Sequence, residues 1–275
     1  MSSTADLLTL EHQIKVLISE SSADVAVALR SLDAEAQLFI NATEMFHAAS
    51  TMKVAVMVEL FAQAELGHLS LDDSIPVINH FNSIVDGSVF SVELEHDLDH
   101  EIIKSPTMTM RELSYAMIVV SSNCATNLIM QRIGVENIQK RLHALDIAGL
   151  NVLRPLEDEK AFKTGVSNTT NALALSTLLW KLGRREIISE RACDEMLNIM
   201  KRHHWVDPIP ANIPEDVAVA NKPGWITKID HDAGIVFSKK PFVLVVLTRG
   251  IEDRSVSSAL IGDITRLCYS ALSFT

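Results

Sequence analysis

The sequence predicts one interrupted α/β domain: a five-stranded antiparallel sheet built from both chain ends, flanked by terminal helices, with an all-α lobe inserted between the ends. Three observations predict it. Strand patterns gather near the two termini, each beside a helical apolar stripe, and the middle of the chain is mostly helical. No internal repeat or Pro/Gly/Ser-rich linker divides the 275 residues. We therefore expect a single domain over 1–275, with an α/β lobe at 1–49 and 212–275 and a helical lobe at 50–211.

The N-terminal part of the sheet follows a helix. Around residues 4–19, Leu and Ile recur at helical spacing. Two short alternating runs come next, Val25–Leu29 and Ala36–Ile40, and Ser31-Leu32-Asp33 separates them. This pattern predicts a β-hairpin.

The C-terminal end mirrors this arrangement with three more strands and a last helix. The candidates are Val217–Ala220, continuing through Lys222-Pro223-Gly224 into Trp225–Ile229, then Ala233–Phe237, Phe242–Thr248 and the helix Ser255–Leu272. The strands from both ends are expected to join one sheet.

The stretch from Ser50 to about Met200 carries the helical patterns. The helices expected there are Ser50–Gly67, Met110–Ser121, Ala125–Ile133, Val135–Leu145, Thr170–Gly183 and Ser189–Lys201. The cleft between this lobe and the sheet is the expected ligand site.

Composition excludes several classes of protein. The apolar fraction of 48% and the charged fraction of 21% are globular usage and exclude disorder. A net charge of −11 argues against nucleic acid or an anionic membrane as the main partner. Apolar stretches such as Phe242–Leu247 are too short to span a bilayer. Cys124, Cys193 and Cys268 lie far apart and predict free thiols. We expect a monomer with a small-molecule substrate and no cofactor or metal.

A serine and a lysine three residues apart open the first helix of the middle region. Ser50 and Lys53 stand in the otherwise apolar segment FHAASTMKVAVMVELF. At this spacing the two side chains share a helix face, and the first turn favours a developing oxyanion. Partial burial would lower the pKa of Lys53 and leave an amine able to act as a base for Ser50. The alternative is a serine N-cap beside a snorkelling lysine.

A polar break, Ser121-Ser122-Asn123, interrupts the apolar stretch MIVVSSNCATNLIM. Such a break can place Ser121 and Asn123 in a cleft, where the hydroxyl passes a proton to a leaving group. The Asn123 amide can accept from a ligand and donate to Lys53. The alternative is a helix break capped by Ser122 or Asn127.

The third motif is Lys222-Pro223-Gly224-Trp225, in a strand candidate. A proline confines a strand to a sheet edge, and a glycine marks close approach of a backbone or ligand. An edge strand beside a cleft leaves N–H groups to hold a ligand carbonyl. The alternative is an ordinary Pro-Gly turn.

Together, S-x-x-K, S-x-N and K-x-G in this order resemble the motifs of the penicillin-recognising serine enzymes: β-lactamases, D-alanyl-D-alanine peptidases and related esterases. The flanks are also similar, with Phe46 and Ala49 before the serine, Asn127 after the second motif, and His231-Asp232-Ala233-Gly234 after the third. The resemblance covers roughly residues 23–249 and is closest to the class A β-lactamase branch.

The resemblance implies a role for each motif residue. Ser50 would be the acylated nucleophile, Lys53 its base or proton relay, and Ser121 the proton donor to the leaving nitrogen. Substrate would be held by Asn123, Lys222, Gly224, Trp225 and Thr227, with the N–H groups of Ser50 and Trp225 as the oxyanion hole.

The resemblance also implies a second base, which would activate the deacylating water. Class A enzymes carry it in E-x-x-L-N on an omega-shaped loop, and the matching segment here is Arg154–Phe162, which lacks the Leu-Asn. Glu157 is the first choice because it lies nearest Arg154, and Glu159 is the second. A solvated acidic loop over 157–160 explains the same residues equally well.

Two further departures concern the other motifs. Pro223 replaces the hydroxyl residue that helps to grip a β-lactam carboxylate, a loss for which Thr227 or Lys228 would compensate, and Ser122 replaces the aspartate of S-D-N. Lys163-Thr164-Gly165 spells the family's usual K-T-G, but a helix rather than a strand follows it, so we assign it to a loop.

A histidine pair outside these motifs is a weaker candidate. His96 and His100 stand at i,i+4 with carboxylates beside them, a spacing that suits a divalent metal. The charge of the surrounding stretch, 93–101, favours a solvated loop instead.

The predicted function is a serine hydrolase that works through an acyl-enzyme on Ser50, with β-lactams as substrates. The alternatives are a D-Ala peptidase or esterase of the same fold, or a β-lactam-binding protein that is acylated without turnover. No secretory leader is visible in the opening residues. The expected location is therefore periplasmic or secreted if a leader was removed, and cytoplasmic otherwise.

Overall fold

The computed structural model describes residues 4–94, 97–202 and 207–273. The helices are α1 Thr4–Glu20, α2 Lys53–Glu65, α3 Asp97–Lys104, α4 Met110–Val119, α5 Asn123–Ile133, α6 Val135–Ala144, α7 Glu159–Lys163, α8 Ala172–Gly183, α9 Glu190–Met200 and α10 Arg254–Ser273, with 3-10 turns η1 Ala49–Met52 and η2 Pro210–Asn212. The main strands are β1 Asp24–Ser31, β2 Gln37–Ile40, β9 Val219–Ile226, β10 Ile229–Val236 and β11 Phe242–Arg249. Short strands are β3 Phe46–His47, β4 Ser74–Pro76, β5 Phe81–Asn82, β6 Val89–Phe90, β7 Thr107–Thr109 and β8 Thr169–Thr170.

The five main strands form one antiparallel sheet in the order β2-β1-β11-β10-β9. The first strand of the chain therefore pairs with the last, over Asp24–Ser31 against Phe242–Arg249. This confirms the predicted sheet built from both ends. It also confirms that the strand containing Pro223 lies at an edge, where its missing N–H interrupts no outer ladder.

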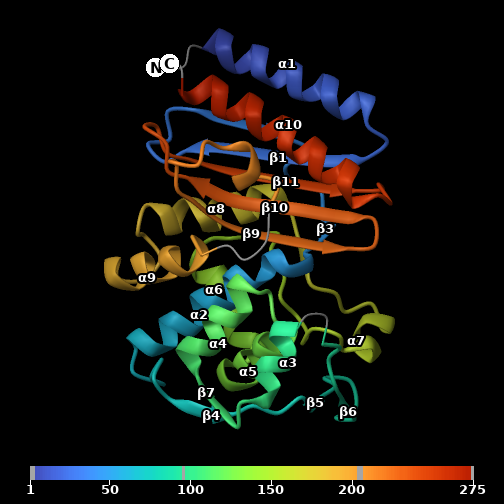
Figure 1. The fold of residues 1–275 in the computed structure, drawn as a ribbon, viewed down its shortest axis with the longest axis vertical. Helices are drawn as coiled ribbons and strands as arrows, with labels where there is room; N and C mark the ends of the chain where they lie inside the picture. Colours follow the sequence, from blue (N-terminus) through green and yellow to red (C-terminus); the bar gives the residue numbers. More distant parts are fainter. Residues whose placement is uncertain (1–3, 95–96, 203–206, 274–275) are drawn as a thin grey trace.

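Helices cover both faces of this sheet (Figure 1). On one face, Val25, Val27 and Leu29 join a core cluster with residues of α1 and α10. On the other face, Ala26 and Ala28 join the larger core that includes α8 and the helical insert. Because β1 is buried on both sides, its sequence is a nearly continuous apolar run.

The structure corrects the predicted ends of several elements. The helix predicted from Ser50 begins at Lys53, after the 3-10 turn η1. The run Trp225–Ile229 is not one strand, because β9 ends at Ile226 and Thr227-Lys228 turn the chain into β10. The helix predicted from Thr170 begins at Ala172, since Asn171 caps it by accepting from the Ala174 N–H. Thr169–Thr170 pair instead with Phe46–His47 as a two-stranded sheet.

The charged stretch 93–101 was predicted as a solvated loop, and this is wrong in part. Residues Asp97–Lys104 form α3. His100 lies on this helix, whereas His96 lies outside the described residues. No group of three or more potential metal ligands occurs within the described ranges.

In the part of the chain that the structure describes, every helix is too short or too polar to cross a membrane. The free thiols were predicted correctly, since Cys124, Cys193 and Cys268 are all unpaired and buried.

Candidate active site

Ser50 stands on a sharp turn between β3 and α2. It lies in the 3-10 turn η1, and Lys53 is the first residue of α2. Ala49, just before it, has a left-handed φ of 45°, which is uncommon for a residue with a side chain. Its N–H donates to Nδ1 of His47 at 3.1 Å, which helps to hold the turn. The turn leaves Ser50 half-buried and on the wall of a pocket.

The Lys53 side-chain nitrogen is directed at the Ser121-Ser122-Asn123 break. Its side chain is fully buried, and Nζ donates to the Ser121 carbonyl at 2.5 Å, to Asn123 Oδ1 at 2.8 Å and to Ser121 Oγ at 3.2 Å. Asn123 thus accepts from Lys53, whereas the sequence interpretation had the amide donating. The S-x-x-K and S-x-N motifs form one hydrogen-bonded network.

Ser121 is held in a strained conformation between α4 and α5. Its φ is 60°, and Ser122 caps α5 by accepting from the Ala125 N–H at 3.1 Å. The Ser121 hydroxyl accepts from Lys53 Nζ at 3.2 Å and from Lys222 Nζ at 3.0 Å. A hydroxyl has two lone pairs and one proton. With both lone pairs engaged by the two lysine side chains, the proton of Ser121 is available to a group in the pocket.

Lys222 lies beneath Ser121 on β9 and is 1% exposed. Its Nζ also donates to the Pro223 carbonyl at 3.1 Å. Burial lowers the pKa of Lys222 to about 8, although nearby Asp207 and Asp232 act in the opposite direction. Burial and the neighbouring Asp207 raise the pKa of Asp232.

Gly224 lets β9 approach the start of η1. A Cβ at this position would lie 2.6 Å from the Ser50 nitrogen and 2.9 Å from the Thr51 nitrogen, both backbone atoms. The close approach expected of this glycine is therefore an approach to the Ser50 backbone. Trp225 follows on the pocket wall, with the Arg254 guanidinium 3.8 Å from the centre of its ring.

Glu157 joins this hydrogen-bonded network through Asn123. Its Oε1 accepts from Asn123 Nδ2 at 2.8 Å, and its Oε2 accepts from the Glu93 N–H at 2.7 Å. Its φ of 61° is left-handed. Asn127 holds the preceding residue, donating to the Leu156 carbonyl at 2.9 Å and accepting from its N–H at 2.8 Å.

Glu159 is placed differently from Glu157. It also lines the pocket, but its carboxylate is exposed and accepts from Lys163 at 2.8 Å. Lys163-Thr164-Gly165 lies at the exposed end of α7 and not on a strand, as the sequence predicted.

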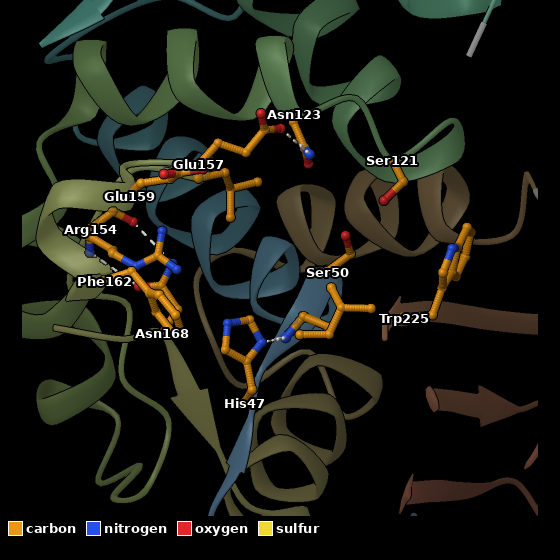
Figure 2. Close-up of a pocket in the computed structure, with 13 residues that line it drawn as sticks. His47, Ser50, Ser121, Asn123, Arg154, Glu157, Glu159, Phe162, Asn168 and Trp225 are labelled. Carbon is orange, nitrogen blue, oxygen red and sulfur yellow. Dashed lines mark hydrogen bonds between the residues drawn. The ribbon is translucent and has the colours of Figure 1, made fainter. Parts of the chain in front are cut away.

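The pocket gathers most of the predicted site residues (Figure 2). It has a volume of about 280 Å³, and Ser50, Ser121, Asn123, Glu157 and Trp225 line it. Three further predicted residues contact the lining residues: Lys53 and Lys222 donate to Ser121, and Gly224 packs against the Ser50 backbone. The structure does not bring Thr227 to the pocket, because Thr227 is exposed in the β9–β10 turn, and Lys228 beside it pairs with Glu252.

Sequence reasoning missed one wall of the pocket, formed by His47, Arg154, Phe162 and Asn168. Arg154 stood out only as the neighbour of Glu157, and Asn168 only as part of the segment before the next helix. The bond from Ala49 to His47 and the antiparallel β3–β8 pair bring these residues together, and neither has a local sequence signal.

Comparison with known proteins places this geometry in a family. The model of the Beta-lactamase2 family, described as the β-lactamase enzyme family, matches residues 9–272. The chain belongs to this family. Its fold is that of the class A β-lactamases, which confirms the resemblance carried by the three motifs.

Individual relatives of this β-lactamase family member are distant. A β-lactamase of Bacillus licheniformis is 30% identical over 60% of the chain, and the match spans 56% of that relative's length. A PBP-A mutant solved as an acyl-enzyme complex with penicillin G is 24% identical, with a TM-score of 0.79 and 98% of each chain covered. The TLA-3 extended-spectrum β-lactamase is 19% identical, with a TM-score of 0.85, covering 97% of this chain and 99% of its own. At these identities, the two structures establish the fold alone.

Proposed function

We propose that this chain is a serine hydrolase that opens β-lactams by acylation of Ser50. The observation that carries the proposal is the Ser121 hydroxyl, which two buried lysines engage at 3.2 and 3.0 Å. Such a hydroxyl can deliver its proton to the nitrogen that leaves when the β-lactam amide breaks.

In the proposed acylation step, the Ser50 oxygen attacks the β-lactam carbonyl and gives its proton to Lys53, which acts in its neutral amine form. The carbonyl oxygen gains negative charge, which the N–H groups of Ser50 and Trp225 would stabilise. A single such donor is typically worth roughly 3–4 kcal/mol in the transition state. The C–N bond then breaks, the nitrogen takes the Ser121 proton, and Lys53 replaces that proton through its hydrogen bond to Ser121 Oγ.

In the proposed deacylation step, Glu157 takes a proton from a water that attacks the Ser50 ester. Its bond with Asn123 supports this role over Glu159, because Asn123 also binds Lys53. The ester C–O bond breaks, and the proton that Glu157 took returns to the Ser50 oxygen.

The first test is acylation of the purified protein by a chromogenic cephalosporin and by a penicillin, with Ser50→Ala as the control. We expect turnover and a covalent adduct on Ser50 in the mass spectrum. If no β-lactam acylates Ser50, the proposal fails.

A second candidate is a β-lactam-binding protein that is acylated and then released slowly. Two observations favour this candidate. Pro223 brings no side-chain hydroxyl beside Lys222, and two hydrogen bonds already occupy the Glu157 carboxylate.

The lifetime of the acyl-enzyme distinguishes a hydrolase from a binding protein that is acylated and slowly released. We expect Glu157→Gln to prolong that lifetime by 100-fold or more, on the order of the 10²–10⁴-fold that a general base contributes. An unchanged lifetime would remove Glu157 from the mechanism.

A further inference from the structure

The wall of the pocket that faces away from Lys222 contains a buried cation. Arg154 is 7% exposed, and its guanidinium lies 5.3 Å from the centre of the Phe162 ring. Nη1 donates to the Pro155 carbonyl at 3.1 Å, while Nε is buried without a hydrogen-bond partner. Within the described residues, Arg154 forms no ion pair. An arginine so placed leaves donor capacity unused, at a cost in desolvation.

The loop that carries Arg154 does not need its guanidinium to close. Asn168 ties the two ends of the loop together: its Oδ1 accepts from the Leu153 N–H at 2.8 Å and the Arg154 N–H at 3.1 Å, and its Nδ2 donates to the Arg154 carbonyl at 3.0 Å. The backbone of Arg154 is thus held by Asn168, and its side chain extends toward the pocket (Figure 2).

The acidic groups near this wall are engaged elsewhere. Glu157 accepts from Asn123 and from the Glu93 N–H, and Glu159 pairs with Lys163. Asp158, which interacts with Arg154 through space, accepts from the Ser83 hydroxyl and the Ile84 N–H. An anion entering the pocket could therefore bind the guanidinium without displacing an ion pair among the described residues.

His47 adds a second polar group to the same wall. Its Nδ1 accepts from the Ala49 N–H, so the proton of the neutral ring is on Nε2. Burial, and then the charge of Arg154, lower the pKa of His47 and keep the ring neutral. A neutral donor beside a guanidinium suits a carboxylate, and the Phe162 ring suits the methylene chain that would lead to it.

We propose that Arg154, His47 and Phe162 form a subsite for a carboxylate at the end of the substrate's acyl substituent. This rests on acylation of Ser50. Ser121 protonates the leaving nitrogen, so the leaving half of the substrate lies on the side of Ser121 and Lys222. The acyl half then extends toward the opposite wall, where Arg154 lies. A planar guanidinium can bind a carboxylate through two parallel hydrogen bonds.

The test compares two penicillins with acyl side chains of equal length, adipyl with a terminal carboxylate and hexanoyl without one. We expect kcat/KM of the wild type to favour the adipyl compound at least 10-fold, and Arg154→Gln to reduce that ratio to about 1. Arg154→Lys, which keeps the positive charge, should give an intermediate adipyl-to-hexanoyl ratio. That result would show that the charge, and not a disturbed loop, accounts for the preference. Arg184→Gln is the matched control, since Arg184 also stacks on an aromatic ring, that of Trp180 at 4.5 Å, outside the pocket.

A wild-type ratio near 1, or a ratio that Arg154→Gln leaves unchanged, would overturn the subsite while leaving Ser50 acylation intact. If neither penicillin acylates Ser50, the proposed function fails, and binding decides on the subsite. We expect Ser50→Ala to bind the adipyl compound at least 10-fold more tightly than the hexanoyl one, and the added Arg154→Gln to abolish the difference. Equal dissociation constants would overturn it.

Discussion

Replacing Gly224 with alanine tests whether the approach of β9 to Ser50 sets the geometry of the nucleophile. The added Cβ would lie 2.6 Å from the Ser50 nitrogen, 2.9 Å from the Thr51 nitrogen and 3.1 Å from the Ala49 Cβ. Ordinary contact begins at 3.4 Å, so about 0.8 Å must be gained against backbone atoms that cannot rotate away. Either β9 or the start of η1 has to move.

The expected effect is larger on reaction than on folding. Overpacking of this kind typically costs roughly 1–3 kcal/mol of stability. A displacement near 1 Å of a reacting group can cost about 10²-fold in rate. We therefore expect Gly224→Ala to fold, to melt a few degrees lower, and to be acylated by a penicillin about 100-fold more slowly.

The assay is the acylation rate, measured by mass spectrometry beside a thermal melt. Gly183→Ala is the matched control, because its Cβ would meet only the flexible ends of Leu32 and Ile235, at 3.1–3.2 Å. It should change stability without slowing acylation. A Gly224→Ala protein acylated within about 3-fold of the wild-type rate would refute the reasoning.

Two further predictions concern the lysine and the loop. Burial lowers the pKa of Lys222 to about 8, so the rate of acylation by an anionic β-lactam should fall as the pH rises through about 8. Acylation by a neutral p-nitrophenyl ester should fall less. Equal pH profiles of the two acylation rates would contradict this prediction. Asn168→Ala removes three hydrogen bonds, each worth about 1 kcal/mol, and should lower the unfolding free energy by about 2–4 kcal/mol. Asn151→Ala, which removes one bond to Thr169, should cost about a third as much in denaturant unfolding.

The strands of the sheet could be predicted from the sequence because their signals are local, and Pro223 alone marks an edge strand. The contacts of the lysine–serine network are not local, since Ser121 lies 68 residues from Lys53 and 101 from Lys222, and they were expected only through the family resemblance. The β9–β10 turn was missed because Trp225–Ile229 contains no glycine or asparagine to mark it. Lys228 takes the left-handed position there, with a φ of 60°, which its residue type does not favour.

The choice between Glu157 and Glu159 could not be made from the sequence, since both are acids in one charged loop. Contacts distant along the chain decide it. Asn127, 29 residues before Leu156, bonds to the Leu156 backbone beside Glu157. Asn123 donates a hydrogen bond to the Glu157 carboxylate. A left-handed residue costs on the order of 1–3 kcal/mol and persists only where its surroundings fix it. Asn127 on the preceding residue, together with Asn123 and the Glu93 N–H on the Glu157 carboxylate, supplies these surroundings here.

The net charge of −11 says little about the charge that a substrate meets in this pocket. Lys53 and Lys222 both donate to Ser121, while Asn221 donates to Asp207 at 3.2 Å and to Asp232 at 2.8 Å on the far side of Lys222. Burial next to Asp207 raises the pKa of Asp232, so the two acids do not both ionise readily. The rise in the Asp232 pKa weakens the negative charge beside Lys222. Lys53 and Lys222 both donate to Ser121, so we expect an anionic substrate to be attracted there despite the acidic chain.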